Sequence, residues 1–407
     1  MDSFKHNIPL LAICQALMLS GMSLIITTAA LVGYALAEDK SLATLPLAAQ
    51  YIATMLTSIP AAMLMDRIGR KTGFMVATVF GASGGTIATL AIAGGEFWFF
   101  VLGTMLIGVF NGFGTYFRFA AADAVPEDKK SRAISYIMAG GVVAAFVGPN
   151  MANLTRDWLY TVEFAGSYAT VVGFYVTAFF VMAFLKLPHR KDDPKELVYA
   201  QRPLSIIASQ PRFIVALLCG MLAYGVMTLV MTATPLAMNH HAHSFANTSF
   251  VIQWHILGMF APSFFTGNLI KRFGEISIMT TGVFLGLACV VINLTGNSVE
   301  HFWIALLLLG ISWNFLFIGA TSLITTTYHQ CERAKTQALN DFVVFTTVAV
   351  ASLSAGSLQH HFGWEIVNIG VLPLLLIMLL ALIWLKLKPS KPESPEPSDT
   401  TPLKESL

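Results

Sequence analysis

Long apolar stretches separated by short polar breaks run through this chain from one end to the other. A helix needs roughly 20 apolar residues to cross the hydrocarbon core of a bilayer, and these stretches are apolar on all sides instead of alternating as in a membrane barrel. The pattern therefore predicts an all-α membrane protein with twelve transmembrane helices, at residues 8–35, 43–65, 72–94, 97–120, 133–152, 165–186, 213–237, 249–270, 276–295, 302–325, 338–358 and 364–386.

The polar connections divide these spans into two sets of six. The longest connection, residues 188–212, carries many charged side chains and is predicted to be a cytoplasmic linker between an N-terminal half, residues 1–187, and a C-terminal half, residues 213–387. The remaining residues, 388–407, are rich in Pro, Ser and Glu, which is typical of a disordered tail.

An internal repeat supports the two halves. A shift of 205 residues places Asp66–Arg70 on Lys271–Glu275, and both segments fall between the second and third spans of their half. The segment 106–114 likewise resembles 308–319. Parallel repeats of this kind occur in transporters whose substrate site lies between the halves.

Composition and charge narrow the class of protein. The chain has 407 residues, of which 56% are hydrophobic and 11% charged, so lipid must be its solvent. Of its 24 Lys and Arg residues, only Lys40 and Arg156 fall in predicted outer loops. This asymmetry predicts a multi-pass protein of the plasma or bacterial inner membrane with both termini in the cytoplasm. A net charge of +2 gives no indication of nucleic-acid binding.

Catalytic and cofactor signatures are missing from the sequence. It contains no nucleotide-binding loop, no metal-ligand spacing and no nucleophile constellation. We therefore expect no enzyme activity, no catalytic residues, no resident metal and no cofactor.

One motif resembles a known family. The segment AAMLMDRIGRK, residues 61–71, is similar to the signature between the second and third helices of the major facilitator superfamily, with Ala62 in place of its first glycine. The resemblance implies two pseudo-symmetric six-helix halves, transport by alternating access, and a conformational latch made by Asp66, Arg67, Gly69 and Arg70 with Asp123 as the acidic partner. The alternative is that these charges only set the orientation in the membrane.

The same resemblance implies that the first and fourth helices of each half line a cavity. Polar or aromatic side chains at the middle depth of those helices predict a substrate pathway, because a polar group in lipid is costly unless it is satisfied. These residues are Ser20, Ser23, Asn111, Thr115, Tyr224, Thr228, Trp313 and Asn314. Each of them could instead join two helices.

Three ionisable residues within the predicted spans extend this pathway. Arg118 needs a partner, which is either Asp123 or a substrate anion. Asp341 can take up and release a proton as the cavity alternates, or it can pair with the inner latch. His255 can orient the substrate or carry the coupling proton, or it can join two helices.

These features predict a secondary active transporter of a small organic solute, coupled to protons and working as a monomer in the bilayer. One alternative is an importer of a siderophore or other metal chelate, because six of the ten histidines fall in predicted outer loops: His240, His241, His243, His301, His360 and His361. An alternative of another class is a membrane receptor with a transporter fold.

Overall fold

The computed structural model describes residues 3–126, 130–159, 162–187, 202–329 and 332–388. Every regular element within these ranges is a helix. The predicted tail after residue 388 and most of the predicted linker lie outside the described residues.

Six membrane spans form the N-terminal half. The elements, in chain order, are α1 (Ser3–Leu36), the short 3-10 helix η1 (Lys40–Leu42), α2 (Leu45–Ile68), α3 (Arg70–Gly94), α4 (Phe97–Gly114), α5 (Phe117–Asp123), α6 (Lys130–Met138), α7 (Gly140–Thr155) and α8 (Ala165–Ala183). The pairs α4 with α5 and α6 with α7 each make one interrupted span.

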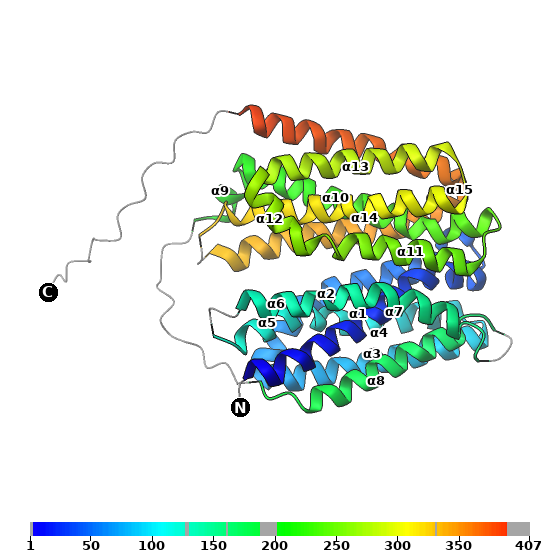
Figure 1. Ribbon diagram of the computed structural model, residues 1–407. Coiled ribbons are helices and arrows are strands. Elements are labelled where there is room, and N and C mark those ends of the chain that lie inside the picture. The colour runs from blue at the N-terminus through cyan, green and yellow to red at the C-terminus, as the bar shows by residue number, and fades with distance from the viewer. Residues whose placement is uncertain (1–2, 127–129, 160–161, 188–201, 330–331, 389–407) are drawn as a thin grey trace.

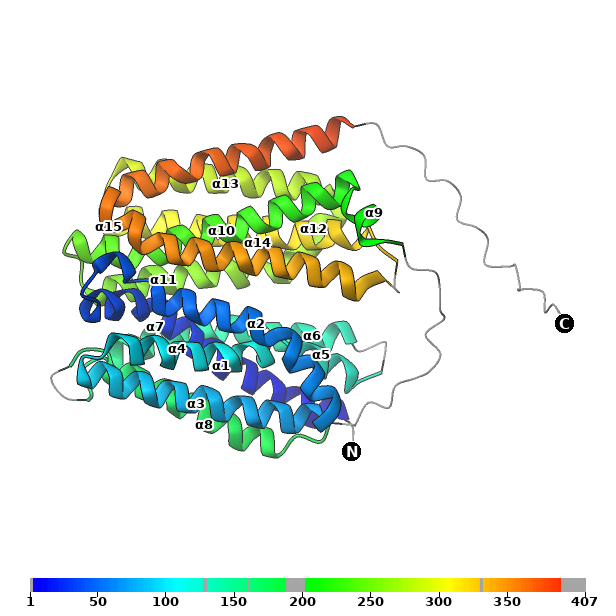
Figure 2. The same cartoon turned by 180° about the vertical axis from the view of Figure 1, so that it is seen from behind.

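The C-terminal half begins with the short helix α9 (Leu204–Ala208). It continues through α10 (Pro211–His240), α11 (Phe245–Phe260), α12 (Ser263–Phe273), α13 (Glu275–Thr295), α14 (Val299–Thr325) and α15 (Arg333–Leu387). The 55-residue α15 contains two spans, because Gly363 has a φ of 77° and the helix turns back there (Figures 1 and 2).

The predicted number of spans is confirmed over the described ranges. Ten helical segments are long and apolar enough to cross a membrane by themselves. The last of these is the double span of α15, and α11 with α12 supplies a further span that is broken at Pro262. The two halves therefore have six spans each.

The internal repeat is visible in the backbone. Gly69 joins α2 to α3 with φ 86° and ψ 148°, and Gly274 joins α12 to α13 with φ 81° and ψ 156°. Positive φ is readily available to glycine but not to residues with a Cβ atom. The same tight turn is thus built at the same place in both halves.

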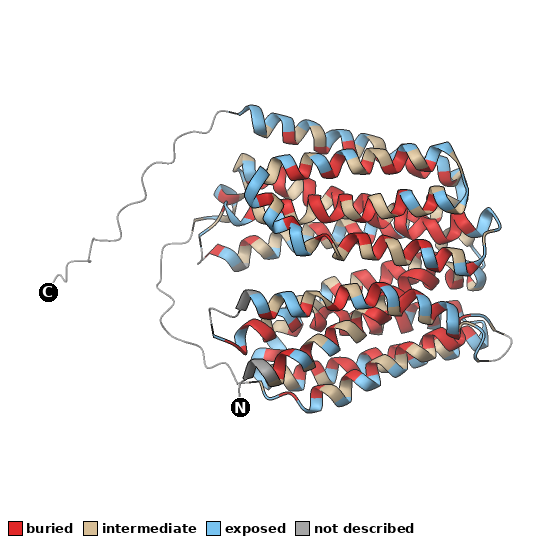
Figure 3. Cartoon of the chain, viewed as in Figure 1, coloured by how far each residue is buried: buried red, intermediate tan, exposed pale blue. Residues whose placement is uncertain are grey.

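The burial of each residue distinguishes the helix faces that pack inside the protein from those that contact lipid. Buried residues follow the inside of both bundles (Figure 3), whereas large apolar side chains such as Trp98, Phe180 and Leu380 are exposed on their outer faces. In water such exposure would be unfavourable, so these faces are the ones that contact lipid.

The two halves meet at one end. We call the end where α1 begins and α15 ends the inner end, and the opposite one the outer end. The bundles lie close together at the outer end and farther apart at the inner end (Figures 1 and 2). Thr44 Oγ1 donates to the Leu353 carbonyl at 3.3 Å and accepts from the Gly356 amide at 3.1 Å, linking the halves near the outer end.

Two further contacts join the halves on the outer side. Asn150 Nδ2 donates to Gln253 Oε1 at 2.6 Å, and the rings of Phe164 and Phe245 lie 4.8 Å apart. The conformation is therefore one that is closed at the outer end.

Candidate functional site

The family motif forms an ion pair at the inner end. Arg70 is the first residue of α3, and its Nη2 lies 2.6 Å from Oδ2 of Asp123, the last residue of α5. The two side chains are 22% and 40% exposed, so solvent weakens the pair only in part. The pair that the resemblance implied is present within one half, while the role of Asp66, Arg67, Gly69 and Arg70 as a latch stays a prediction.

Arg118 lies near the boundary between the two halves. Asp123 pairs with Arg70, and whether it also serves Arg118, or a substrate anion does, stays a prediction. Arg118 is exposed on α5, its guanidinium lies 4.8 Å from the centroid of the Phe119 ring, and Asp341 on α15, in the other half, is within its electrostatic range. Asp341 accepts a hydrogen bond from Asn340 at 3.0 Å. Both roles of Asp341, proton transfer and pairing with the inner latch, stay predictions.

An aromatic cluster lies within electrostatic range of Arg118 and Asp341. We use this name for Tyr224 on α10, Trp313 and Phe317 on α14, and Phe260 at the end of α11. The rings of Trp313 and Phe317 stack at 5.0 Å with an interplanar angle of 9°, and Tyr224 meets both edge-on at 5.1 and 5.2 Å. The ring of Phe260 lies 6.5 Å from that of Trp313.

The aromatic cluster also lies near charged residues and near a residue of the N-terminal half. Tyr224 is within electrostatic range of Arg118, Asp341 and Tyr51, a buried residue of α2. Sequence reasoning found Tyr224 and Trp313 but missed Phe317, Phe260 and Tyr51. The i, i+4 spacing of Trp313 and Phe317 on one helix face was the signal that could have found Phe317.

Buried polar atoms without partners mark the middle of the molecule. Both amide atoms of Asn111 and of Gln50 are buried and, among the described residues, have no hydrogen-bond partner. The same holds for the hydroxyls of Thr228 and Thr232 on α10. Leaving such a group unpaired costs about 1–3 kcal/mol, which water or a polar solute could offset. Gln50 and Thr232 were missed, although each is a polar residue in the middle of an apolar span.

Two of the predicted pathway residues take part in helix packing, and a third bonds its own helix. A Cβ atom on Gly148 of α7 would lie 2.5 Å from the Ser23 Cβ and 2.7 Å from the Ser20 carbonyl oxygen, so both serines belong to the close contact of α1 with α7. Thr115 donates to the Gly112 carbonyl of its own helix at 2.8 Å. The helix-joining alternative describes the surroundings of the two serines, and the substrate role of all three stays a prediction.

Asn314 holds the break in the eighth span. Its Nδ2 donates to the Met259 carbonyl and to Ser263 Oγ, each at 2.7 Å, and its Oδ1 accepts from Thr266 Oγ1 at 2.6 Å. Met259 precedes the break at Pro262, and Ser263 and Thr266 follow it. The side chain therefore has a bonded role that ties both sides of the break to α14.

His255 joins two helices. Its ring is fully buried, and Nδ1 lies 2.8 Å from the Leu306 carbonyl of α14, which identifies Nδ1 as the protonated nitrogen. Nε2 is buried without a partner among the described residues. The helix-joining alternative describes this position, while a part in proton transfer is untested.

The outer histidines do not gather into a metal site over the described ranges, where no group of three or more His, Cys, Asp or Glu side chains could hold an ion. His243 Nε2 lies 2.7 Å from the Asn297 carbonyl, and His361 Nδ1 lies 2.9 Å from that of Ser357. Two of the six outer histidine rings therefore form hydrogen bonds with backbone carbonyls.

Comparison with known sequences gives matches along the whole chain. The sequence profile of the Major Facilitator Superfamily matches residues 11–231 and 216–406. The riboflavin transporter RfnT of Brucella anthropi is 44% identical over 385 residues, covering 95% of this chain and 96% of that one. The uncharacterized MFS-type transporter YddS of Bacillus subtilis is 24% identical over 398 residues, covering 94% of this chain and 91% of the relative.

Solved structures share the fold. A bacterial homologue of the human lysosomal transporter Spinster, in an inward-facing and occupied conformation, matches with a TM-score of 0.69 at 15% identity, covering 93% of this chain and 96% of that one. The human organic anion transporter MFSD10 matches with a TM-score of 0.63 at 13% identity, covering 93% and 99%.

Proposed function

The chain belongs to the major facilitator superfamily and transports a small organic solute, and from that premise we propose that the solute is riboflavin or a closely related flavin. The observation that carries this proposal is the 44% identity with a riboflavin transporter over nearly the full length of both chains. The solved structures, being under 25% identical, support the fold alone.

The geometry of the middle of the molecule agrees with a flavin. Its ring system is flat, which suits the aromatic cluster, since aromatic rings gain about 0.5–1.5 kcal/mol from stacked or edge-on contacts. One edge of the flavin carries carbonyl acceptors and an N–H donor, and the unpaired amides of Asn111 and Gln50 offer the matching donors and acceptors. The hydroxyls of Thr228 and Thr232 suit the ribityl chain.

We assign proton coupling to Arg118 and Asp341, two opposite charges that lie within electrostatic range of each other. Arg118 and Asp341 sit on opposite halves, so alternating access changes their separation. A carboxylate that loses its cationic partner binds a proton more readily. Asp341 is therefore the proposed proton carrier and Arg118 its partner.

The orientation follows from the distribution of Lys and Arg. We assign the inner end to the cytoplasm of a bacterial inner membrane, with both termini inside. The halves 1–187 and 213–387 rock about the site between them, and one chain suffices for a complete pathway.

The proposal is tested with purified protein in liposomes, by the uptake of riboflavin followed through its fluorescence together with the internal pH. Riboflavin uptake that depends on the protein supports the proposal. Trp313→Ala should raise the KM about tenfold, because it removes the stacked ring, whereas Trp98→Ala, at an exposed lipid-facing position, should leave KM unchanged.

The same assay separates the rival functions. Binding of riboflavin without uptake would indicate a receptor, and uptake of an iron-loaded siderophore in place of riboflavin would indicate a chelate importer. Asp341→Asn should abolish the pH change that accompanies uptake. A wild-type pH change in that variant would remove Asp341 from the coupling step.

A further inference from the structure

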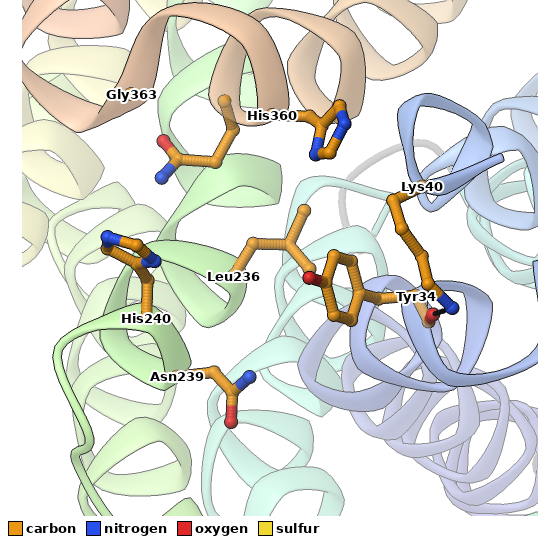
Figure 4. Close-up of a pocket in the computed structure, with 9 residues that line it drawn as sticks. Tyr34, Lys40, Leu236, Asn239, His240, His360 and Gly363 are labelled. Atoms are coloured by element: carbon orange, nitrogen blue, oxygen red, sulfur yellow. Dashed lines mark hydrogen bonds between the residues drawn. The ribbon is translucent and has the colours of Figure 1, made fainter.

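A cavity lies at the outer end, and none of the residues that line it belongs to the aromatic cluster. Its volume is about 460 Å³, within the roughly 300–1,000 Å³ of small-molecule sites (Figure 4). We call it the outer pocket. Its lining comes from both halves: Tyr34 and Lys40 from the N-terminal half, and Leu236, Asn239, His240, Gly356, Gln359, His360 and Gly363 from the C-terminal half.

The lining combines apolar surface with several hydrogen-bonding groups. Figure 4 shows Leu236 and the Tyr34 ring facing the middle of the pocket, with His240, His360 and Asn239 around them. Gln359 Oε1 is buried and has no partner among the described residues. An apolar surface with a few converging polar groups is the usual make-up of a site for an organic molecule.

The positive charge in the lining of the outer pocket favours an anionic ligand. Lys40 is the one lining residue with a formal charge at pH 7, counting histidines as neutral. Its ammonium donates to the carbonyls of Tyr34 at 2.7 Å and Ala37 at 2.8 Å, which leaves one of three N–H groups for a ligand. The carboxylate of the neighbouring Asp39 is held by the Ser41 amide at 2.9 Å and is not part of the lining.

From these observations we propose that the outer pocket binds a small aromatic carboxylate from the outer side and thereby holds the outer end closed. The carboxylate pairs with Lys40, and the ring packs on Tyr34 and Leu236. The proposal does not rest on flavin transport, because the pocket is separate from the aromatic cluster and its lining is different.

A ligand in the outer pocket stabilises the closed outer end because the pocket lies between the two halves. Ala30 and Ala43 of the N-terminal half pack against Leu236 beside it, and Thr44 bonds Leu353 and Gly356 across the same boundary. Separation of the halves at this end would pull Lys40 away from Leu236 and His360. A ligand that needs both walls stabilises the closed conformation by RT ln(1 + [L]/Kd), about a hundredfold shift at 100 times its Kd.

The binding test uses naphthalene-2-carboxylate as the probe and its neutral carboxamide as the matched control, titrated calorimetrically into the purified protein. The carboxylate should bind at least tenfold more tightly than the carboxamide. Lys40→Gln should remove that difference, whereas Lys271→Gln, an exposed lysine at the inner end, should keep it. Equal binding of the two compounds, no binding of either, or wild-type selectivity in Lys40→Gln would overturn the proposal.

A second measurement follows closure directly in a protein whose Lys40 is intact. Ala43→Cys places a thiol at a fully buried position of the boundary, where it reacts with a membrane-impermeant maleimide only when the outer end opens. Saturating naphthalene-2-carboxylate should slow labelling at least fivefold, and the carboxamide should not. Labelling at an unchanged rate would refute the closing effect.

Both experiments can be done without any transported solute. A failure of riboflavin uptake would therefore leave the outer pocket intact, and a failure of carboxylate binding would leave the transport proposal intact.

Discussion

Asn314 offers the sharpest test of how the structure positions the aromatic cluster. Pro262 has no N–H, so it cannot continue the backbone hydrogen bonds of α11, and the eighth span breaks there. The three hydrogen bonds of Asn314 to Met259, Ser263 and Thr266 hold the two pieces at a fixed angle against α14.

The expected cost of Asn314→Leu follows from these bonds. Interhelical hydrogen bonds in membrane proteins contribute about 0.6 kcal/mol each on average and up to about 1.7. The loss of three, with buried partners left unpaired, should lower the free energy of unfolding by about 2–4 kcal/mol. The midpoint of thermal unfolding in detergent should fall by roughly 5 °C or more.

Transport should change along with stability. Phe260 directly precedes the break, and its ring lies 6.5 Å from Trp313. A relaxed break moves this ring away from the cluster, so we expect the KM for the transported solute to rise several-fold. The assay is solute uptake in liposomes at matched protein content, together with the thermal midpoint.

Asn293→Leu is the matched control. Asn293 Nδ2 donates to Asn368 Oδ1 at 2.8 Å in another buried helix contact of the same half. This variant should lose stability while keeping the wild-type KM. The reasoning would be refuted if Asn314→Leu kept both its thermal midpoint and its KM, or if the two variants changed KM equally.

Three further predictions concern charges and the contact between the halves. Hydrogen bonds from Arg202 at 2.6 and 2.8 Å lower the pKa of the buried Glu332 carboxyl from 4.5 to about 2. Its stabilisation, about 3 kcal/mol, is therefore complete above pH 4.5 and is lost as the pH falls toward 2, so thermal melts of the wild type but not of Glu332→Gln should show this loss. Asp66→Asn should slow solute uptake several-fold with normal membrane insertion, and an unchanged rate would show that the motif is not a latch. Thr44→Val removes the bonds to Leu353 and Gly356, so in the Ala43→Cys background an impermeant maleimide should label the thiol faster.

Hydropathy and charge determined most of the architecture from the sequence. Twelve spans could be predicted because each crossing must satisfy its own backbone groups and bury an apolar length set by the bilayer. The Asp66–Lys71 motif led to the family and to the ion pair of Arg70 with Asp123. Irregular details were missed: the break at Pro262 falls inside a span that reads as one apolar run, and its geometry depends on Asn314 from another helix.

The candidate site, too, could be predicted only in part from the sequence. Residue type and depth in the membrane identified Asn111, Tyr224, Thr228 and Trp313 from the sequence, because polar and aromatic groups in an apolar run need a reason to be there. The rotation of each helix about its axis could not be read from the sequence. It places Ser23 and the backbone of Ser20 against α7 and gives Asn314 partners on both sides of a helix break.

The approach of residues from opposite halves was decided only by the tertiary structure. Arg118 and Asp341 are separated by more than 200 residues in the sequence, so no local pattern links them, and Asp123 was the nearer candidate along the chain. The outer pocket has the same origin, since its walls belong to different halves and exist as one cavity only in the conformation closed at the outer end. The sequence determines which helices enter the membrane and in what order, whereas the charge partners and the cavity depend on how the two bundles dock.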